Sequence, residues 1–157
     1  MQFIFDNFAI IWFCVAFWVF GISTFTHYRN KRNGLYFEEP TPETIIYSES
    51  YASGRSHKSS KTKLGGASNC LKVIITPTHL FLRPLFPLII LGPHFDLIHV
   101  IPLSKITGIE KSIGFITGGL DIVYLNEEME KAQFTIMSRR QTDLNAVLTK
   151  AKEEHTQ

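Results

Sequence analysis

The stretch CLKVIITPTHLFLR, residues 70–83, decides the fold of this chain. Large aliphatic side chains stand at every second position of its first half, which is the period of a β-strand with one buried face. These alternating residues are Leu71, Val73 and Ile75. Pro77 and Thr78 then supply the residue types of a tight turn, and residues 79–83 predict a returning strand. The stretch therefore predicts an antiparallel hairpin.

Five further segments carry the same strand signals. Each is short, rich in β-branched or aromatic side chains, and bounded by turn residues such as Pro102 or Asn126. They are residues 44–51, 97–101, 106–113, 120–125 and 132–137. Together with the hairpin they make seven short strands at fairly even spacing, which favours a β-sandwich or a small β-barrel.

The C-terminal region changes from the period of a strand to that of a helix. Apolar side chains recur there at i, i+3, i+4 and i+7, namely Leu144, Val147, Leu148 and Ala151. Ser138 is predicted to cap the helix, and Gln141 can complete a capping box. Arg139 and Arg140 oppose the helix dipole, so another group is expected to satisfy them. Residues 43–157 are thus expected to form a mainly-β domain that ends in one helix.

The N-terminal region contains a run of 18 residues without charge, FAIIWFCVAFWVFGISTF, residues 8–25. About 20 apolar residues cross the hydrocarbon core of a bilayer as a helix, and residues 3–5 extend the run. Its apolar side chains would cover every side of a helix, which argues against a surface-lying helix. A secretory signal peptide is disfavoured because no basic residue precedes the run and no small-x-small cleavage site follows it. The interpretation is a retained transmembrane anchor over residues 1–26, with a buried helix of a soluble core as the alternative.

Basic residues after the uncharged run predict its orientation. They are His27, Arg29, Lys31 and Arg32, whereas Asp6 precedes the run. By the positive-inside rule, the C-terminal side faces the cytoplasm. Residues 27–42 predict a linker, because they contain Asn33-Gly34 and end near Pro40 and Pro42. The expected location is the cell inner membrane, as an integral single-pass protein with its C-terminal domain in the cytoplasm.

Composition limits the class of protein. The chain has 157 residues, of which 45% are hydrophobic and 19% charged. That apolar content excludes a disordered chain, and the length allows one domain of ordinary size. A formal net charge of +2 argues against a strongly basic nucleic-acid binder, so no nucleic acid is expected as a partner. Cys14 and Cys70 cannot build a disulfide framework.

Short motifs resemble those of a known fold family. Residues 101–106, IPLSKI, followed by Ile109, resemble the segment between the fourth and fifth strands of bacterial pleckstrin-homology-like and GRAM-like domains. Residues 73–80, VIITPTHL, resemble their second hairpin. Residues 54–56 and 65–69 are similar to segments of small bacterial membrane-anchored proteins of unknown function. The resemblance covers residues 43–154 and implies a seven-stranded pleckstrin-homology-like barrel, with one open end plugged by the C-terminal helix.

The sequence lacks the motifs of familiar catalytic and metal sites. It has no G-x-S-x-G, C-x-x-C or H-E-x-x-H, and His94 and His99 would point to opposite faces of a strand. Glu127, Glu128 and Glu130 indicate a solvated hairpin tip rather than a catalytic pair of carboxylates. We therefore expect that the chain is not an enzyme and that it needs no metal or other cofactor.

One segment is dense in positive charge. Residues 53–64, SGRSHKSSKTKL, hold four basic residues and no acidic one, whereas residues 33–157 as a whole hold 13 of each. We call this segment the basic loop; its candidate binding residues are Arg55, Lys58, Lys61 and Lys63. The family resemblance implies that this hairpin loop holds the headgroup in phosphoinositide binders. Residues 61–63 have the spacing of those binders but lack their Arg, so the prediction is diffuse attraction to anionic lipid, with a flexible solvated loop as the alternative.

An apolar segment, LFPLIIL, follows at residues 85–91. Its seven residues are too few to span a bilayer, so they either pad the core or form an exposed loop that touches a membrane or a partner.

Taken together, the sequence predicts a membrane-tethered, non-catalytic binding module whose cytoplasmic domain recognises anionic lipid headgroups or a protein partner. The alternative is a structural or assembly subunit of a larger membrane protein complex.

Overall fold

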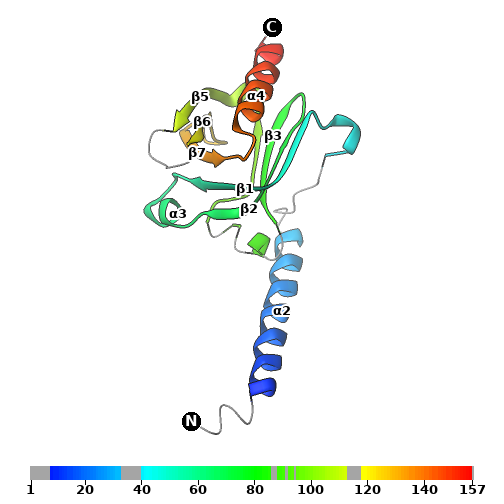
Figure 1. The fold of residues 1–157 in the computed structure, drawn as a ribbon. Coiled ribbons are helices and arrows are strands. Elements are labelled where there is room, and N and C mark those ends of the chain that lie inside the picture. The colour runs from blue at the N-terminus through cyan, green and yellow to red at the C-terminus, as the bar shows by residue number, and fades with distance from the viewer. Residues whose placement is uncertain are drawn as a thin grey trace. The chain divides into compact units, whose positions relative to one another are not determined.

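The computed structural model describes residues 8–32, 40–85, 88–90, 92–93, 95–112 and 118–156. The chain divides into two compact units between Glu38 and Glu39. The first unit contains the helix α2 (Phe8–Arg32), and the second contains the sheet and the C-terminal helix α4 (Gln141–Thr156) (Figure 1).

The second unit is built on an antiparallel sheet of seven strands in the order β4-β3-β2-β1-β7-β6-β5 (Figure 1). The strands are β1 (Tyr47–Ser56), β2 (Ala67–Ile75), β3 (His79–Pro84), β4 (His99–Pro102), β5 (Ile106–Ser112), β6 (Gly119–Leu125) and β7 (Lys131–Met137). All seven predicted strands are therefore confirmed. The first one starts later than expected and continues to Ser56, which places part of the basic loop within a strand.

The hairpin predicted from residues 70–83 is the pairing of β2 with β3. Val73 lies opposite Leu82 and Ile75 opposite Leu80, and all four side chains are buried. The turn is closed by Thr76, whose backbone N–H donates to the carbonyl of His79 at 2.9 Å. The aliphatic period of this stretch thus supplies one wall of the hydrophobic core.

The helix α4 packs on the core formed by the strands. Its predicted apolar stripe is confirmed, since Leu144, Leu148 and Ala151 are buried in the core and Val147 packs partly against it. The helix contacts β5, β6 and the short 3₁₀ turn Leu103–Lys105, which joins the two edge strands β4 and β5. Seven antiparallel strands followed by this helix fit the pleckstrin-homology-like fold expected from the sequence.

The start of α4 differs from the prediction. The helix begins at Gln141, so Ser138 is not its N-cap. The Ser138 hydroxyl instead donates to the Glu49 carboxylate at 2.5 Å and accepts the N–H of Arg140 at 2.9 Å. Glu49, which is buried in β1, also accepts the backbone N–H of Arg139 at 3.0 Å and the hydroxyl of Tyr47 at 2.7 Å. Of the two unfavourably placed arginines, Glu49 attracts Arg140, whose guanidinium also lies over the Tyr47 ring, whereas the Arg139 guanidinium donates to the side-chain oxygen of Asn69.

The prediction for the N-terminal region needs a correction. Within the ranges that the structure describes, no helix is long and apolar enough to cross a membrane. The predicted N-terminal transmembrane anchor is therefore wrong, and so is the location as a single-pass protein of the inner membrane, on which the predicted orientation of the domain depended.

The described helix also differs from the predicted anchor in its polar groups. In α2, Trp12 and Trp18 carry polar indole N–H groups, and the charged Arg29 lies within the same helix. The Thr24 hydroxyl is polar as well and donates to a backbone carbonyl one turn earlier at 2.9 Å. The same helix then continues to Arg32, through part of the region predicted as a linker.

Candidate functional site

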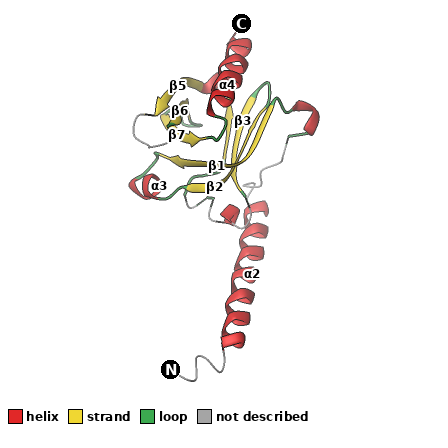
Figure 2. Cartoon of the chain, in the orientation of Figure 1, coloured by secondary structure: helices red, strands yellow, loops and turns green. Residues whose placement is uncertain are grey.

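The basic loop, residues 53–64, begins in the last part of β1 and ends in the short helix α3 (Ser60–Leu64), which precedes β2 (Figure 2). Lys58 and Lys63 are exposed, whereas Arg55 is half-buried in β1, where it pairs with Thr135 of β7. The backbone of Lys61 belongs to α3, and its side chain lies outside the described part of the chain. The structure therefore places the predicted binding residues on one continuous strand-loop-helix segment.

Hydrogen bonds give the tip of the basic loop a defined shape. The Thr62 hydroxyl accepts the N–H of Ser59 at 2.8 Å, and the Ser59 hydroxyl accepts the N–H of Thr62 at 3.2 Å. Thr62 is only 5% exposed although both of its neighbours are lysines. Reciprocal bonds of this kind hold the first turn of a helix, so the segment is folded and not merely a solvated run of Ser and Lys.

A polar network that the sequence did not reveal lies at the base of the basic loop. The buried Ser56 hydroxyl donates to the Asp96 carboxylate at 2.5 Å and accepts the N–H of Lys58 at 3.2 Å. Asp96 comes from the connection between β3 and β4, so this bond ties two separate connections together. Asp96 also has a backbone φ of 52°, a left-handed conformation that Asp tolerates better than most residues.

His99 and Tyr124 complete this network. The two nitrogens of the His99 ring lie 2.7 Å from the backbone carbonyl of Asp96 and 3.1 Å from the Tyr124 hydroxyl. Burial lowers the pKa of His99, against the opposing effect of Asp96, and the nearby Lys58 lowers it further. Burial and the Asp96 carboxylate both raise the pKa of Tyr124. Near neutral pH both side chains are therefore uncharged parts of the scaffold beneath Lys58.

A second polar chain runs from His57 through the buried Thr135 of β7 to Asp121 of β6. Its ring nitrogen Nε2 lies 2.7 Å from the Thr135 hydroxyl, which donates to the Asp121 carboxylate at 2.5 Å. Burial lowers the pKa of His57, and the positive charges of Arg55 and Lys63 lower it further, whereas Asp121 raises it. The sequence contained no signal for this chain, because its members come from β6, β7 and the end of β1.

The apolar segment at residues 85–91 is described only in part. Leu85 and Ile89 are half-buried and Leu88 is exposed, while residues 86, 87 and 91 lie outside the described part. His94 lies outside it as well. Both interpretations of the segment, core padding and an exposed loop, stay open.

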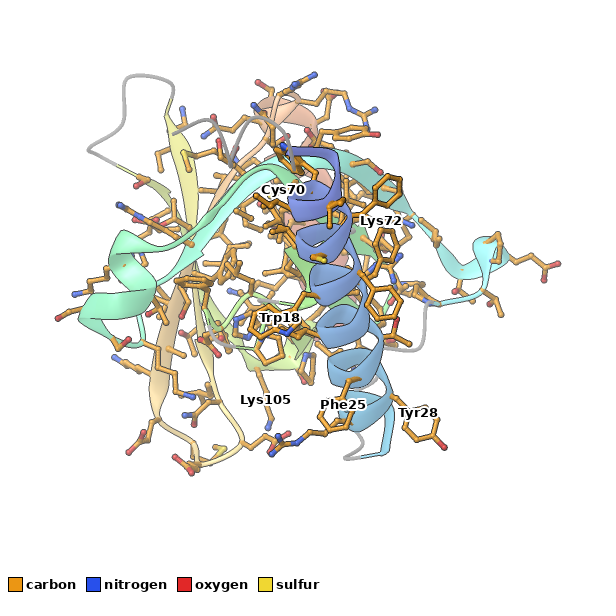
Figure 3. All side chains as sticks on the ribbon, turned by 90° about the horizontal axis from the view of Figure 1, so that it is seen from below. Trp18, Phe25, Tyr28, Cys70, Lys72 and Lys105 are labelled. Carbon is orange, nitrogen blue, oxygen red and sulfur yellow. The ribbon has the colours of Figure 1, made fainter. Side chains whose placement is uncertain are left out.

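The helix α2 carries a shallow apolar groove on its own surface. The groove is lined by Phe17, Phe20, Gly21, Thr24, Phe25 and Tyr28. Figure 3 shows Trp18, Phe25 and Tyr28 projecting from the helix, and all three side chains are exposed. Exposed aromatic surface of this kind is typical of regions that contact another molecule.

Comparisons with known proteins add little to this geometry. No family model matches the chain, and no curated protein matches it. Among solved structures, the Vps36 N-terminal PH domain is similar with a TM-score of 0.48 and 12% sequence identity, over 77% of this chain and 94% of that chain. The narrower resemblance to bacterial and GRAM-like domains stays a prediction.

Proposed function

We propose that this protein is a non-catalytic binding module whose basic loop recognises the headgroups of anionic lipids. The observation that carries the proposal is the folded basic loop itself, in which Lys58 and Lys63 are exposed within a short segment that joins β1 to β2. Arg55 is the third cation on this segment, and Lys61 is the fourth residue that we assign to it. Clustered cations attract anionic membrane surfaces at about 1 kcal/mol per residue close to the surface.

Two carboxylates near the basic loop offset part of its positive charge, since Asp121 acts as an anion on His57 and Asp96 on His99. Asp96 accepts the Ser56 hydroxyl, and Asp121 accepts the Thr135 hydroxyl. Both carboxylates are half-buried and held by these hydroxyls, whereas Lys58 and Lys63 are exposed and so are the charges open to a membrane surface. At physiological salt the field of these lysines reaches about 8 Å, which suits a contact at short range.

Sedimentation with lipid vesicles tests the proposal. The full chain is mixed with vesicles of phosphatidylcholine alone or of phosphatidylcholine and phosphatidylserine, and the bound fraction that depends on phosphatidylserine is measured. Replacing the four candidate residues by Gln is expected to lower that affinity by about 2–4 kcal/mol, because each contributes about 1 kcal/mol when close to the surface. Higher salt is expected to weaken binding of the parent in the same way.

A matched pair of double variants separates a local site from overall charge. Lys58→Gln/Lys63→Gln removes two exposed cations of the basic loop, and Lys111→Gln/Lys150→Gln removes two exposed cations elsewhere. The first pair is expected to weaken binding and the second to leave it unchanged. Equal effects of both pairs, or parent binding that ignores phosphatidylserine, would contradict the proposal.

A second candidate function is favoured by α2. The exposed aromatic side chains and the groove on this helix suit contact with another protein, as in an assembly subunit of a larger complex. Copurification of a protein partner in constant proportion, lost on Phe17→Ser/Phe20→Ser/Phe25→Ser substitution, would support this function. Retained copurification by the triple variant would contradict it.

A further inference from the structure

His57 occupies a defined position inside the basic loop. It directly follows β1, and its backbone N–H donates to the carbonyl of Gln133 at 3.0 Å. Its ring nitrogen Nε2 lies 2.7 Å from the Thr135 hydroxyl. That hydroxyl has one proton, which it donates to Asp121 at 2.5 Å, so the Nε2–H of His57 must be the donor to Thr135. The remaining ring nitrogen, Nδ1, is the one at which a further proton would bind.

The charged groups around this ring come from three elements. Arg55 lies on β1, Lys63 on α3 and Asp121 on β6, while the contact from β7 is the neutral Thr135. In the register of the sheet, Arg55 lies opposite Thr135, and Thr135 lies opposite Asp121. Arg55, which we assign to the lipid site, therefore lies opposite the same residue that His57 contacts, and Lys63 is the further cation that acts on the ring.

These surroundings keep the ring neutral in the unbound protein. Burial is the largest cause that lowers the pKa of His57, and Arg55 and then Lys63 also lower it. Asp121 acts in the opposite direction. An anion bound by Arg55 and Lys63 would offset the two positive charges and leave the effect of Asp121 in place, so a proton would bind the ring more readily in the complex.

We propose that His57 is a further binding residue of the basic loop and that it couples anion binding to proton uptake, so that affinity for anionic headgroups rises as the pH falls. The inference rests on the function proposed above. By linkage, an anion that favours protonation of His57 is itself bound more tightly once the ring is protonated. The fifth positive charge would then lie beside Arg55 and Lys63, within reach of the same ligand.

His99 provides the matched comparison. It is the other described imidazole near the basic loop, and Lys58 acts on it much as Arg55 acts on His57. Both of its ring nitrogens are already engaged, by the Asp96 carbonyl and by the Tyr124 hydroxyl, and its ring stacks edge-on against Phe134. It therefore has no nitrogen to offer to an anion, and its replacement should not alter the coupling.

Vesicle binding at two pH values tests the coupling with the full chain. The parent is expected to bind phosphatidylserine vesicles about fivefold more tightly at about pH 5.5 than at about pH 7.5, the factor that one further charge near the surface contributes. His57→Gln, whose amide can still donate to Thr135, should lose this gain, and His99→Gln should retain it. A gain that survives in His57→Gln, or is absent from the parent, would overturn the inference.

Nuclear magnetic resonance on the unmodified protein gives an independent readout. The pKa of the His57 ring is measured in sodium chloride and in sodium sulfate of equal ionic strength, because sulfate is an anion that does not titrate in this range. A higher pKa of His57 in sulfate, with little change for His99, is expected. An unchanged pKa of His57 would contradict the inference even if every variant failed to fold.

The two proposals fail in different ways. Vesicle binding that requires the four basic residues but ignores His57 overturns only the coupling. Vesicle binding that ignores the four basic residues overturns the lipid site, and the coupling falls with it.

Discussion

Replacing Glu49 by Ala is expected to destabilise the domain strongly. The carboxylate of this buried residue accepts three hydrogen bonds, from the hydroxyls of Tyr47 and Ser138 and from the N–H of Arg139. Hydrogen bonds to a charged group contribute about 1.5–3 kcal/mol each, and three that share one acceptor do not add fully. We therefore expect a loss of about 3–5 kcal/mol in the free energy of unfolding.

Guanidinium unfolding followed by circular dichroism measures this loss. Glu49→Ala should lower the midpoint, and an exposed control, Glu110→Ala on β5, should stay within about 0.5 kcal/mol of the parent. Equal midpoints for Glu49→Ala and the parent would refute the view that this carboxylate anchors the start of α4 to β1.

The pH dependence of the stability difference between the parent and Glu49→Ala gives a second test of the role of this carboxylate. Burial raises the pKa of Glu49, but the bonds from Ser138, Tyr47 and Arg139 lower it by more, so the net shift is downward. A carboxyl whose pKa is lower in the folded state stabilises the protein above the pKa of its unfolded state, 4.5. That contribution is lost as the pH falls through the folded pKa. The stability difference between the parent and Glu49→Ala should therefore shrink below about pH 4.5.

Three further perturbations have definite expected outcomes. Leu148→Asp places a charge in the contact of α4 with the core, so it should lower the free energy of unfolding by several kcal/mol in thermal melting. The control Ala146→Asp lies on the exposed side of α4 and should change that free energy by about 0.5 kcal/mol or less. Gly54→Ala should destabilise by about 1–3 kcal/mol, because its added Cβ would lie 2.7 Å from an aromatic ring carbon on β7. Gly108→Ala, where the nearest atom would be 3.7 Å away, should be tolerated in the same assay. Burial is the main cause that lowers the pKa of His99, so as the pH falls the unfolded state binds a proton at this ring before the folded state does. The domain should therefore lose stability below about pH 6.5, and His99→Gln should lose less.

The sequence was sufficient for those parts of the fold that depend on local period. Alternation around Val73 and the helical stripe around Leu148 each require one buried face, and the structure buries both. The basic loop could also be predicted from the sequence, because residues 53–64 contain four basic residues and no acidic one. Its placement was less accurate, since Arg55 belongs to β1 and lies half-buried in the sheet.

The polar networks depend on contacts that the sequence does not encode locally. Ser56 and Asp96 are 40 positions apart, and Glu49 and Ser138 are 89 positions apart. Their meeting follows from the strand order, which places β1 beside β7, and from the contact of the connection after β3 with the end of β1. Local pattern therefore predicted Ser138 as a helix cap, whereas the folded chain uses it to hold Glu49.

The error at the N-terminus had a different origin. The anchor was predicted because the run at residues 8–25 is uncharged, is close to the length that crosses a bilayer, and would present apolar side chains on every side of a helix. The structure describes a longer helix, which continues to Arg32 through residues that are polar or basic. Hydropathy over the whole helix is the more demanding test.

The measurement that tests the central claim most directly is the mapping of the ligand on the folded domain. The full chain, labelled with ¹⁵N, is titrated with dihexanoyl phosphatidylserine, and shifts of the amide signals are followed residue by residue. The proposal predicts that the largest shifts fall on residues 55–63 and on Asp96 to His99, and that dihexanoyl phosphatidylcholine does not produce them. Shifts confined to α2 or to α4, or equal shifts with both lipids, would contradict the claim that the basic loop is a site for anionic headgroups.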